Sequence, residues 1–279
     1  MNFLLLIKRN KLVFFSVLFV LLILILVILS LFGVSFSNVT FDSQDENLIL
    51  SSPSLSHPLG TDQLGRDLLA RLIYGARLSF LVAIITASIA FFIGTSVGSI
   101  AAIAGGKIDS FICRAIDVIY SIPDLLILSI IGLLLNRSTT GILFAIGFIS
   151  WMDLARLTRA EILKLKQSEF ILSAHAIGLG RTRTFLRHML PNILSTILVS
   201  ITFVMPRAII SESTLSFLGL GISPPNCSWG TLAGDGWQFL NTHTNLIFYP
   251  SLLIMLTVLS LNIIGDCLAE LNQPKKSYI

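Results

Sequence analysis

Charged residues are scarce in this sequence of 279 residues: they make up 12% of it, whereas 54% of the residues are hydrophobic. A soluble domain carries about 25% charged residues, so the composition excludes a chain that folds around an ordinary soluble core. The net charge is only +4, and no run of basic residues alternates with aromatic ones. A nucleic-acid partner therefore has no support.

Reactive and metal-binding groups are also few. The three cysteines stand far apart in the sequence, as Cys113, Cys227 and Cys267. They form no CxxC pair, and the four histidines show no metal-ligand spacing. Gly106 and Lys107 resemble the end of a phosphate-binding loop, but Ala101 and Ile108 occupy other positions that such a loop requires. The sequence predicts no metal site, no catalytic residue and no cofactor or ATP bound by this chain.

Long apolar runs are what the sequence has in abundance. A helix crosses a bilayer core of about 30 Å with about 20 residues. Six stretches meet this need, so we predict an all-α polytopic membrane protein with spans at about 12–32, 78–104, 115–135, 141–157, 193–210 and 246–264. We expect Pro123 to kink the third span. Gly94 and Gly98 in the second span should allow another helix to approach closely, and Gly105 with Gly106 should end it.

The distribution of basic residues predicts the orientation. Of the 19 Lys and Arg residues, 14 lie in segments that six spans would place on one side, within 8–11, 107–114, 156–187 and 275–276. This excess marks the cytoplasmic side. The predicted parts are a cytoplasmic arm and first span at 1–33, an outer segment at 34–76, a five-helix core at 77–272 and a cytoplasmic tail at 273–279. Within the core, 159–192 is an inner loop and 211–245 an outer segment.

One alternative topology places residues 57–76 inside, and it requires that the first run does not span. Arg66, Arg71 and Arg77 are the local exception to the charge rule, and we expect Asp62 and Asp67 to pair with them.

Ionisable residues inside or beside spans are costly and therefore suggest function. They are Asp117, Asp124, Asp153, Arg207, Glu212 and Asp266. Asp153 and Arg156 are three residues apart, so we expect them to pair. We expect Asp124 and Glu212 to lie toward a cavity or the outer interface. For each residue alone, a structural ion pair remains the simpler interpretation.

A polar stretch at 169–192, EFILSAHAIGLGRTRTFLRHMLPN, interrupts the apolar runs. Gly178 and Gly180 predict a bend between two short helices, and His188 is expected to cap the second. Small residues before the bend would allow the first helix to lie in another protein's groove. The alternative is an ordinary basic loop.

This stretch resembles the coupling loop of ABC importer permeases, whose pattern is roughly E-Y-V-E-A-A-x-A-x-G followed by H-x-L-P-N. The residues that fit are Glu169, Phe170, Ala174, Ala176, Gly178, His188, Leu190, Pro191 and Asn192. Leu172 and Ser173 depart from it. The resemblance implies that this loop docks on an ATPase through Glu169, Ala174, His175, Ala176, Gly178, Arg181, Arg183, Pro191 and Asn192.

The outer segment ESTLSFLGLGISPPNCSWGTL is rich in glycine and proline, and we expect Trp229 to lie near the membrane–water interface. The segment resembles a signature of the dipeptide/oligopeptide/nickel permease family, as do residues 57–80 and 151–163. Cys227 and Ala269 depart from that family's usual residues. The residues suggested for the pore or the periplasmic side are Asp124, Glu212, Phe217, Gly219, Gly221 and Trp229.

This resemblance covers about residues 57–275 and is to the second-permease type of the family. It implies a type I ABC importer permease (MetI-like) fold with six spans in the bacterial inner membrane and both termini in the cytoplasm. The implied partners are a second related permease, two ABC ATPases that hold ATP and Mg²⁺, a periplasmic or lipid-anchored solute-binding protein, and membrane lipid. The implied function is import of di- or oligopeptides. Import of nickel or another small solute, an ion-coupled secondary transporter, and a membrane scaffold or enzyme are the alternatives.

Overall fold

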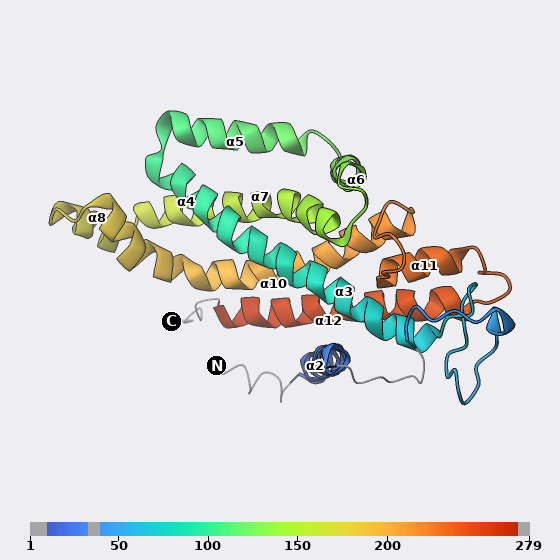
Figure 1. Ribbon diagram of the computed structural model, residues 1–279. Coiled ribbons are helices and arrows are strands. Elements are labelled where there is room, and N and C mark those ends of the chain that lie inside the picture. Colours follow the sequence, from blue (N-terminus) through green and yellow to red (C-terminus); the bar gives the residue numbers. More distant parts are fainter. Residues whose placement is uncertain (1–9, 33–39, 273–279) are drawn as a thin grey trace.

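The computed structural model describes residues 10–32 and 40–272. Five helical stretches in this part are long and apolar enough to cross a membrane, and a bent pair of helices makes a possible sixth. Figure 1 shows α7, α10 and α12 running roughly in one direction, with α3 and α4 crossing them obliquely. The prediction of an all-α, multi-span membrane protein is confirmed.

The helices do not have the same lengths as the apolar runs from which the spans were predicted. Their bounds are α2 (Lys11–Leu31), α3 (Leu68–Ile89), α4 (Thr95–Ala104), α5 (Gly106–Tyr120), α6 (Asp124–Leu134), α7 (Thr139–Lys166), α8 (Glu169–Ala176), α9 (Arg181–Thr184), α10 (Leu190–Phe217), α11 (Trp229–Trp237) and α12 (Asn245–Asn272), with a short 3₁₀ turn η1 (Glu46–Leu48). The π-helical turns η2 (Ala90–Gly94) and η3 (Phe185–Met189) join α3 to α4 and α9 to α10. Continuous helices of 37 and 36 residues result.

These two long helices extend well beyond the predicted spans. At about 1.5 Å per residue each is about 55 Å long, whereas a bilayer core is about 30 Å thick. Hydropathy marks only the part that lies in lipid. The polar start of α3 remains helical because it is capped locally: Asp67 precedes α3, and its side chain accepts a hydrogen bond from the Ala70 amide at 2.8 Å.

The predicted third span is the one that the structure corrects. Instead of one kinked helix, α5 and α6 meet at an angle of 85°. Pro123 stands before the first residue of α6 with ψ of 130°, outside the helical region. Because proline also lacks an amide hydrogen, the chain breaks there. At the other end of α5, Gly105 and Gly106 have φ of 63° and 52°. They end α4, as predicted, and turn α5 back alongside α7 (Figure 1).

Glycines bring α7 close to the helix that precedes α5. A Cβ atom on Gly98 would lie 2.3 Å from the Ala155 carbonyl oxygen, and one on Gly94 would lie 2.7 Å from the Trp151 carbonyl oxygen. The predicted role of these two glycines in close helix packing is therefore confirmed.

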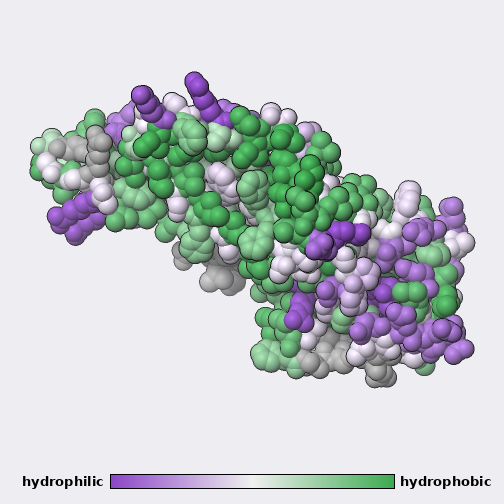
Figure 2. Space-filling model, turned by 45° about the horizontal axis from the view of Figure 1, so that its top comes forward, coloured by the Kyte–Doolittle hydropathy of each residue, from purple (hydrophilic) through white to green (hydrophobic). Residues whose placement is uncertain are grey.

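The surface matches a protein in a membrane. Figure 2 shows hydrophobic residues over the long helices, whereas hydrophilic residues gather at the end that carries α11 and residues 40–67. Large apolar side chains exposed on the long helices include Phe92, Phe144 and Met255. Figure 1 shows α2 almost end-on, so it lies across α12, against which it packs.

Candidate functional site

Three polar side chains from three helices meet beside the middle of α7. Tyr120 ends α5, Asp153 lies halfway along α7, and Arg207 follows Pro206 inside α10. The Tyr120 hydroxyl donates to one oxygen of Asp153 at 2.6 Å, and Arg207 Nη1 donates to the other at 2.8 Å. A single carboxylate therefore links α5, α7 and α10.

A second ion pair lies one helical turn further along α7. Arg156 pairs with Asp117 of α5, and its guanidinium carbon lies 4.6 Å from the centre of the Tyr120 ring. The predicted pairing of Asp153 with Arg156 is therefore wrong. Arg156 bonds to Asp117 of α5, whereas Asp153 bonds to Tyr120 of α5 and to Arg207 of α10.

A third pair continues this contact between α5 and α7. Arg159 Nη2 donates to Asp109 Oδ2 at 2.6 Å. The positions bonded along the two antiparallel helices are 109 with 159, 117 with 156, and 120 with 153. Polar side chains thus bridge α5 and α7 at three positions.

The charged cluster faces outward. The Arg207 side chain is 75% exposed and that of Asp153 is 57% exposed. A charge at the centre of a membrane span costs at least about 2.5–3.5 kcal/mol when it faces lipid. Asp153 lies within the predicted span at 141–157, toward its inner end, so this exposed charged face of α5, α7 and α10 is suited to water or another protein, not to lipid.

A pocket of about 430 Å³ lies at this cluster. Its polar lining consists of Tyr120, Asp124, Ser150, Asp153, Ser200, Arg207 and Ser211. Asp124, which was predicted to lie toward a cavity or the outer interface, lines this pocket. Its carboxylate has no hydrogen bond or ion pair with any other residue in the described part of the chain. The pocket falls within the size range of small-molecule sites.

The predicted docking loop forms a helical tip at one end of the molecule (Figure 1). Glu169 begins α8 and Ala176 ends it, with His175 between them. Gly178 follows with φ of 83°, and Arg181 begins α9. The predicted bend between two helices is confirmed, although the second helix continues into α10.

The rest of the predicted loop residues lie along that continuous helix. Arg183 is exposed on α9, and Pro191 and Asn192 stand in the first turn of α10. The Asn192 side-chain amide donates to the His188 carbonyl oxygen at 2.6 Å. His188 itself lies within η3. The prediction that it caps a helix is wrong, because the helix runs through this position without an end.

The tip carries exposed apolar side chains that sequence reasoning missed. Phe170 is 47% exposed, Leu172 56% and Ile177 78%. Ile171, between the first two, is buried in the cluster that includes Ile162 of α7. Exposed apolar residues outside the membrane-spanning runs suit a protein partner. The sequence of α8 could have indicated this surface, because apolar residues lie on two faces of the helix and the rest of the chain covers only one of them.

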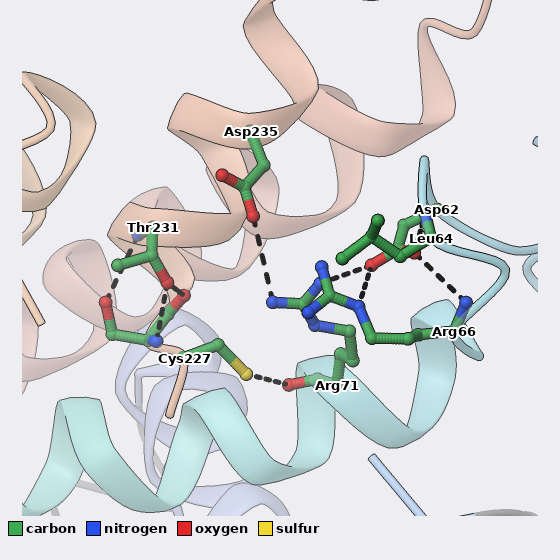
Figure 3. A network of polar contacts seen from close by, with 8 residues as sticks. Asp62, Leu64, Arg66, Arg71, Cys227, Thr231 and Asp235 are labelled. Carbon is green, nitrogen blue, oxygen red and sulfur yellow. Dashed lines mark hydrogen bonds and ion pairs between the residues drawn. The ribbon is translucent and has the colours of Figure 1, made fainter. Parts of the chain in front are cut away.

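A network of charges joins three segments at the opposite end of the molecule (Figure 3). Asp62 accepts a hydrogen bond from Arg66 Nε at 2.8 Å and pairs with Arg71 of α3. Arg71 Nη2 also lies 3.7 Å from Asp235 of α11. Partial burial raises the pKa of Asp235, and the positive charge of Arg71 acts in the opposite direction. The network ties residues 62–66, α3 and α11 together.

The predicted pairing of local acids with these arginines is right for Asp62 and wrong for Asp67. Asp67 is buried and lies 3.0 Å from His57 Nδ1. Its second oxygen caps α3, so both oxygens are engaged before an arginine can reach them. Cys227, also buried, donates to the Arg71 carbonyl oxygen at 3.7 Å (Figure 3). Burial raises the pKa of the Cys227 thiol.

Two residues predicted near an interface or cavity are instead internal. Glu212 is fully buried, and its Oε1 accepts hydrogen bonds from Ser216 and Ser228, both at 2.6 Å. Trp229 is also fully buried, and its indole donates to the Leu72 carbonyl oxygen at 2.9 Å. The prediction for Glu212 is wrong, because α11 folds back onto α3 and α10 and covers both side chains. The depth of Trp229 near the membrane–water interface stays a prediction.

The other outer candidates surround that buried junction. Phe217, the last residue of α10, makes an edge contact with Trp237 at 6.0 Å between ring centres. Gly219 has φ of 77°, and a Cβ atom on Gly221 would overlap the Ser216 hydroxyl. Phe217 and Gly219 line an outer pocket of about 830 Å³. The structure therefore groups the outer candidates near Glu212 and Trp229, whereas Asp124 lies apart in the smaller pocket.

Metal-binding groups are lacking in the part of the chain that the structure describes: no three His, Cys, Asp or Glu residues are placed to hold an ion. The three cysteines are free.

Comparison with known proteins gives consistent matches. The family described as binding-protein-dependent transport system inner membrane component matches residues 94–278. The dipeptide transport system permease protein DppC of Bacillus subtilis (strain 168) is 37% identical over 270 residues, which cover 96% of this chain and 83% of that protein. The oligopeptide transport system permease protein OppC of Haemophilus influenzae is 37% identical over 242 residues, which cover 86% and 78% of the two chains.

A solved structure has the same fold. It is an inward-facing conformation of the MetNI methionine ABC transporter, with a TM-score of 0.60 at 15% sequence identity. The match covers 74% of this chain and 98% of that chain. The predicted MetI-like fold is confirmed.

Proposed function

This chain belongs to the family of binding-protein-dependent transport system inner membrane components, and from that premise we propose that it imports di- and oligopeptides as one of two permease subunits. It is a transport subunit and not an enzyme. Its similarity to dipeptide and oligopeptide permeases supports peptides as the cargo. The second permease is a related chain, and a periplasmic or lipid-anchored binding protein delivers the peptide.

The proposed location is the bacterial inner membrane, with both termini in the cytoplasm. The excess of basic residues on the segments assigned to that side supports this orientation. The end of α12 and the tip formed by α8 lie toward the same end of the molecule (Figure 1). Residues 159–192 then face the cytoplasm, and residues 34–76 and 211–245 face the periplasm.

The observation that carries the proposal is the tip. Its exposed Phe170, Leu172 and Ile177 offer an apolar contact to an ABC ATPase, and the neighbouring Arg183 and Arg187 are exposed as well. Two such ATPases hold ATP and Mg²⁺, so this chain itself binds no cofactor.

The connections of the tip explain how movement reaches the membrane. Only residues 167 and 168 separate α7 from α8, and α9 continues through η3 into α10. When ATP binding closes the ATPase pair, the tip moves as a rigid body and α7 and α10 move with it. Both helices carry the charged cluster around Asp153. Their movement changes the exposure of the path between the two permeases.

The outward-facing cluster supports the proposal that a second permease packs beside this chain. Its exposed charges are unsuited to lipid, but they suit a water-filled path closed on the other side by a similar subunit. This face therefore lines the path along α5, α7 and α10.

The test is reconstitution of the chain with its second permease, ATPases and binding protein in proteoliposomes. We expect ATP-dependent uptake of radiolabelled trialanine, and co-purification of the ATPases with this chain. The double variant Phe170→Ser/Leu172→Ser should lose both. Leu55→Ser is the matched control, because Leu55 is fully exposed at the opposite end of the molecule and should leave both unchanged.

Three results would contradict parts of the proposal. Uptake driven by an ion gradient without ATP would indicate a secondary transporter. Uptake of Ni²⁺ but not of peptide would show that the cargo is nickel. Normal ATPase association in the tip variant would show that the tip is not the docking surface.

A further inference from the structure

We propose that the pocket of about 430 Å³ beside the charged cluster is a transient subsite for the positively charged amino end of the peptide, with Asp124 as its counter-ion. This inference rests on the proposed function and names what part of the cargo the path recognises.

The charges of the pocket lining favour a cation. Asp153 and Arg207 neutralise each other through their 2.8 Å contact, and Tyr120 donates to the remaining oxygen of Asp153. Asp124 is left with a free carboxylate. The α-amino group of a peptide has a pKa of about 8, so at pH 7 it is mostly protonated. A carboxylate bonded to an ammonium group makes a charge-assisted hydrogen bond, which is stronger than a neutral one.

The serines of the lining favour the same ligand. Ser150 and Ser200 donate their hydroxyl hydrogens to carbonyl oxygens of their own helices, at 2.8 Å from Ile146 and 2.9 Å from Thr196. A hydroxyl that has donated its hydrogen still has lone pairs that accept. Ser150 and Ser200 are thus acceptors toward the pocket, as Asp124 is. An ammonium group has three N–H donors to offer them.

The location of Asp124 distinguishes its carboxylate from an ordinary charge on the protein surface. Asp124 is exposed and shares the pocket with Asp153, at the middle of α7. An ionised group at such a depth requires water, a cation or a partner charge. Along a transport path binding must be strong enough for entry and weak enough for exit. One carboxylate with a few hydroxyl groups meets that requirement. It also recognises the backbone terminus that all peptides share, without selecting side chains.

Asp124 also begins α6, where a negative charge stabilises the helix dipole. The experiment therefore separates this structural role from binding. A purely structural role predicts that Asp124→Asn destabilises α6. It also predicts that the effect of this substitution on peptide binding is the same whether the amino end of the peptide is free or blocked.

The experiment uses the assembled transporter, with both permeases and both ATPases, in lipid nanodiscs without the binding protein. Saturation-transfer NMR is recorded with trialanine, trialanine amide and N-acetyl-trialanine. We expect signals from the first two, which keep a free amino group, and none above background from the third. Asp124→Asn should weaken trialanine binding about tenfold or more, because it removes a hydrogen bond to a charged group. Asp124→Glu should retain binding.

Asp266→Asn is the matched control. Asp266 lies exposed on α12 outside the pocket, so the same chemical change there should leave binding unchanged. ATP-dependent uptake of trialanine in proteoliposomes is measured in parallel, and Asp124→Asn should lower its maximal rate by a similar factor.

Several outcomes would overturn the subsite. Equal signals from trialanine and N-acetyl-trialanine would show that the amino end is not recognised. Unchanged binding and uptake by Asp124→Asn, with normal uptake by the wild type, would refute the subsite and leave the proposed function intact. Loss of the second permease from the purified Asp124→Asn complex would assign Asp124 to the contact between permeases instead. Absence of peptide uptake by the wild-type assembly would refute the proposed function itself.

Discussion

The bend at Gly178 offers the sharpest test of how the tip works. Gly178 has φ of 83°, and a Cβ atom built on it would meet no other atom within 4 Å. A substitution there is therefore strained in its backbone but free of clashes within this chain. The series Gly178→Asn, Gly178→Ala and Gly178→Val isolates that strain.

The magnitude follows from the left-handed backbone conformation. An ordinary L-residue loses about 1–2 kcal/mol in that region, and a β-branched one up to about 3 kcal/mol. Asparagine is better tolerated, because its short polar side chain bonds locally. Since 1.4 kcal/mol is a factor of ten, the native bend should fall in population about tenfold with alanine and about a hundredfold with valine. The decrease with asparagine should be the smallest.

The assay pairs ATP-dependent peptide uptake with co-purification of the ATPases from the same membranes. We expect both to follow the order Gly, Asn, Ala, Val, at normal expression, because the tip lies outside the apolar spans. Gly180→Val is the matched control. Gly180 is two residues away, has no positive φ and also has no atom within 4 Å of a built Cβ.

The comparison of asparagine with alanine can refute this reasoning. Asparagine is the larger residue, so a docking partner that simply lacks room would reject it more strongly than alanine. Uptake that falls with side-chain volume would show that contact with the partner controls this position. Normal uptake by Gly178→Val would show that the stretch is an ordinary basic loop.

The remaining predictions concern burial, packing and charge. In folded protein a maleimide reagent should react far more slowly with Cys227 than with Leu55→Cys, because Cys227 is buried and its pKa is raised; equal rates before unfolding would contradict the described packing. Gly98→Leu should destabilise the protein by at least about 1–3 kcal/mol, since its Cβ would lie 2.3 Å from a carbonyl oxygen of α7, and an unchanged thermal unfolding temperature in detergent would oppose this. Arg207→Ala and Asp153→Ala should each lower the yield of assembled transporter more than the double variant does, because each leaves one charge unpaired; additive losses would argue against the pair.

Local features of the chain were predictable where the cause itself is local. The breaks at Gly105 and Gly178 require a positive φ, which glycine adopts most readily. The contact of Gly94 and Gly98 with α7 follows from small side chains on one helical face. Asp62 pairs with Arg66 because the two residues are four apart and in one tight segment.

Predictions failed where a distant segment supplies the partner. The sequence did not predict the burial of Trp229, whose indole donates to the Leu72 carbonyl oxygen, 157 residues away. Glu212 was expected near a cavity or interface, but it is buried and bonded to Ser228, the residue that caps α11. Phe170, Leu172 and Ile177 were not identified as an exposed surface, because hydropathy does not tell which apolar face a helix buries against its own chain.

By itself the sequence determined the helical class, the approximate spans, the position of the turns and, through its motifs, the family. Each of these depends on residues within one or two helical turns of one another or on hydropathy along one helix. Only the tertiary structure decided which ionisable side chains meet. Asp153 had a possible partner three residues away, yet it bonds to Arg207, 54 residues away, while Arg156 bonds to Asp117, 39 residues away. Ion pairs form between side chains that packing brings together in space, and that packing is a property of the whole chain.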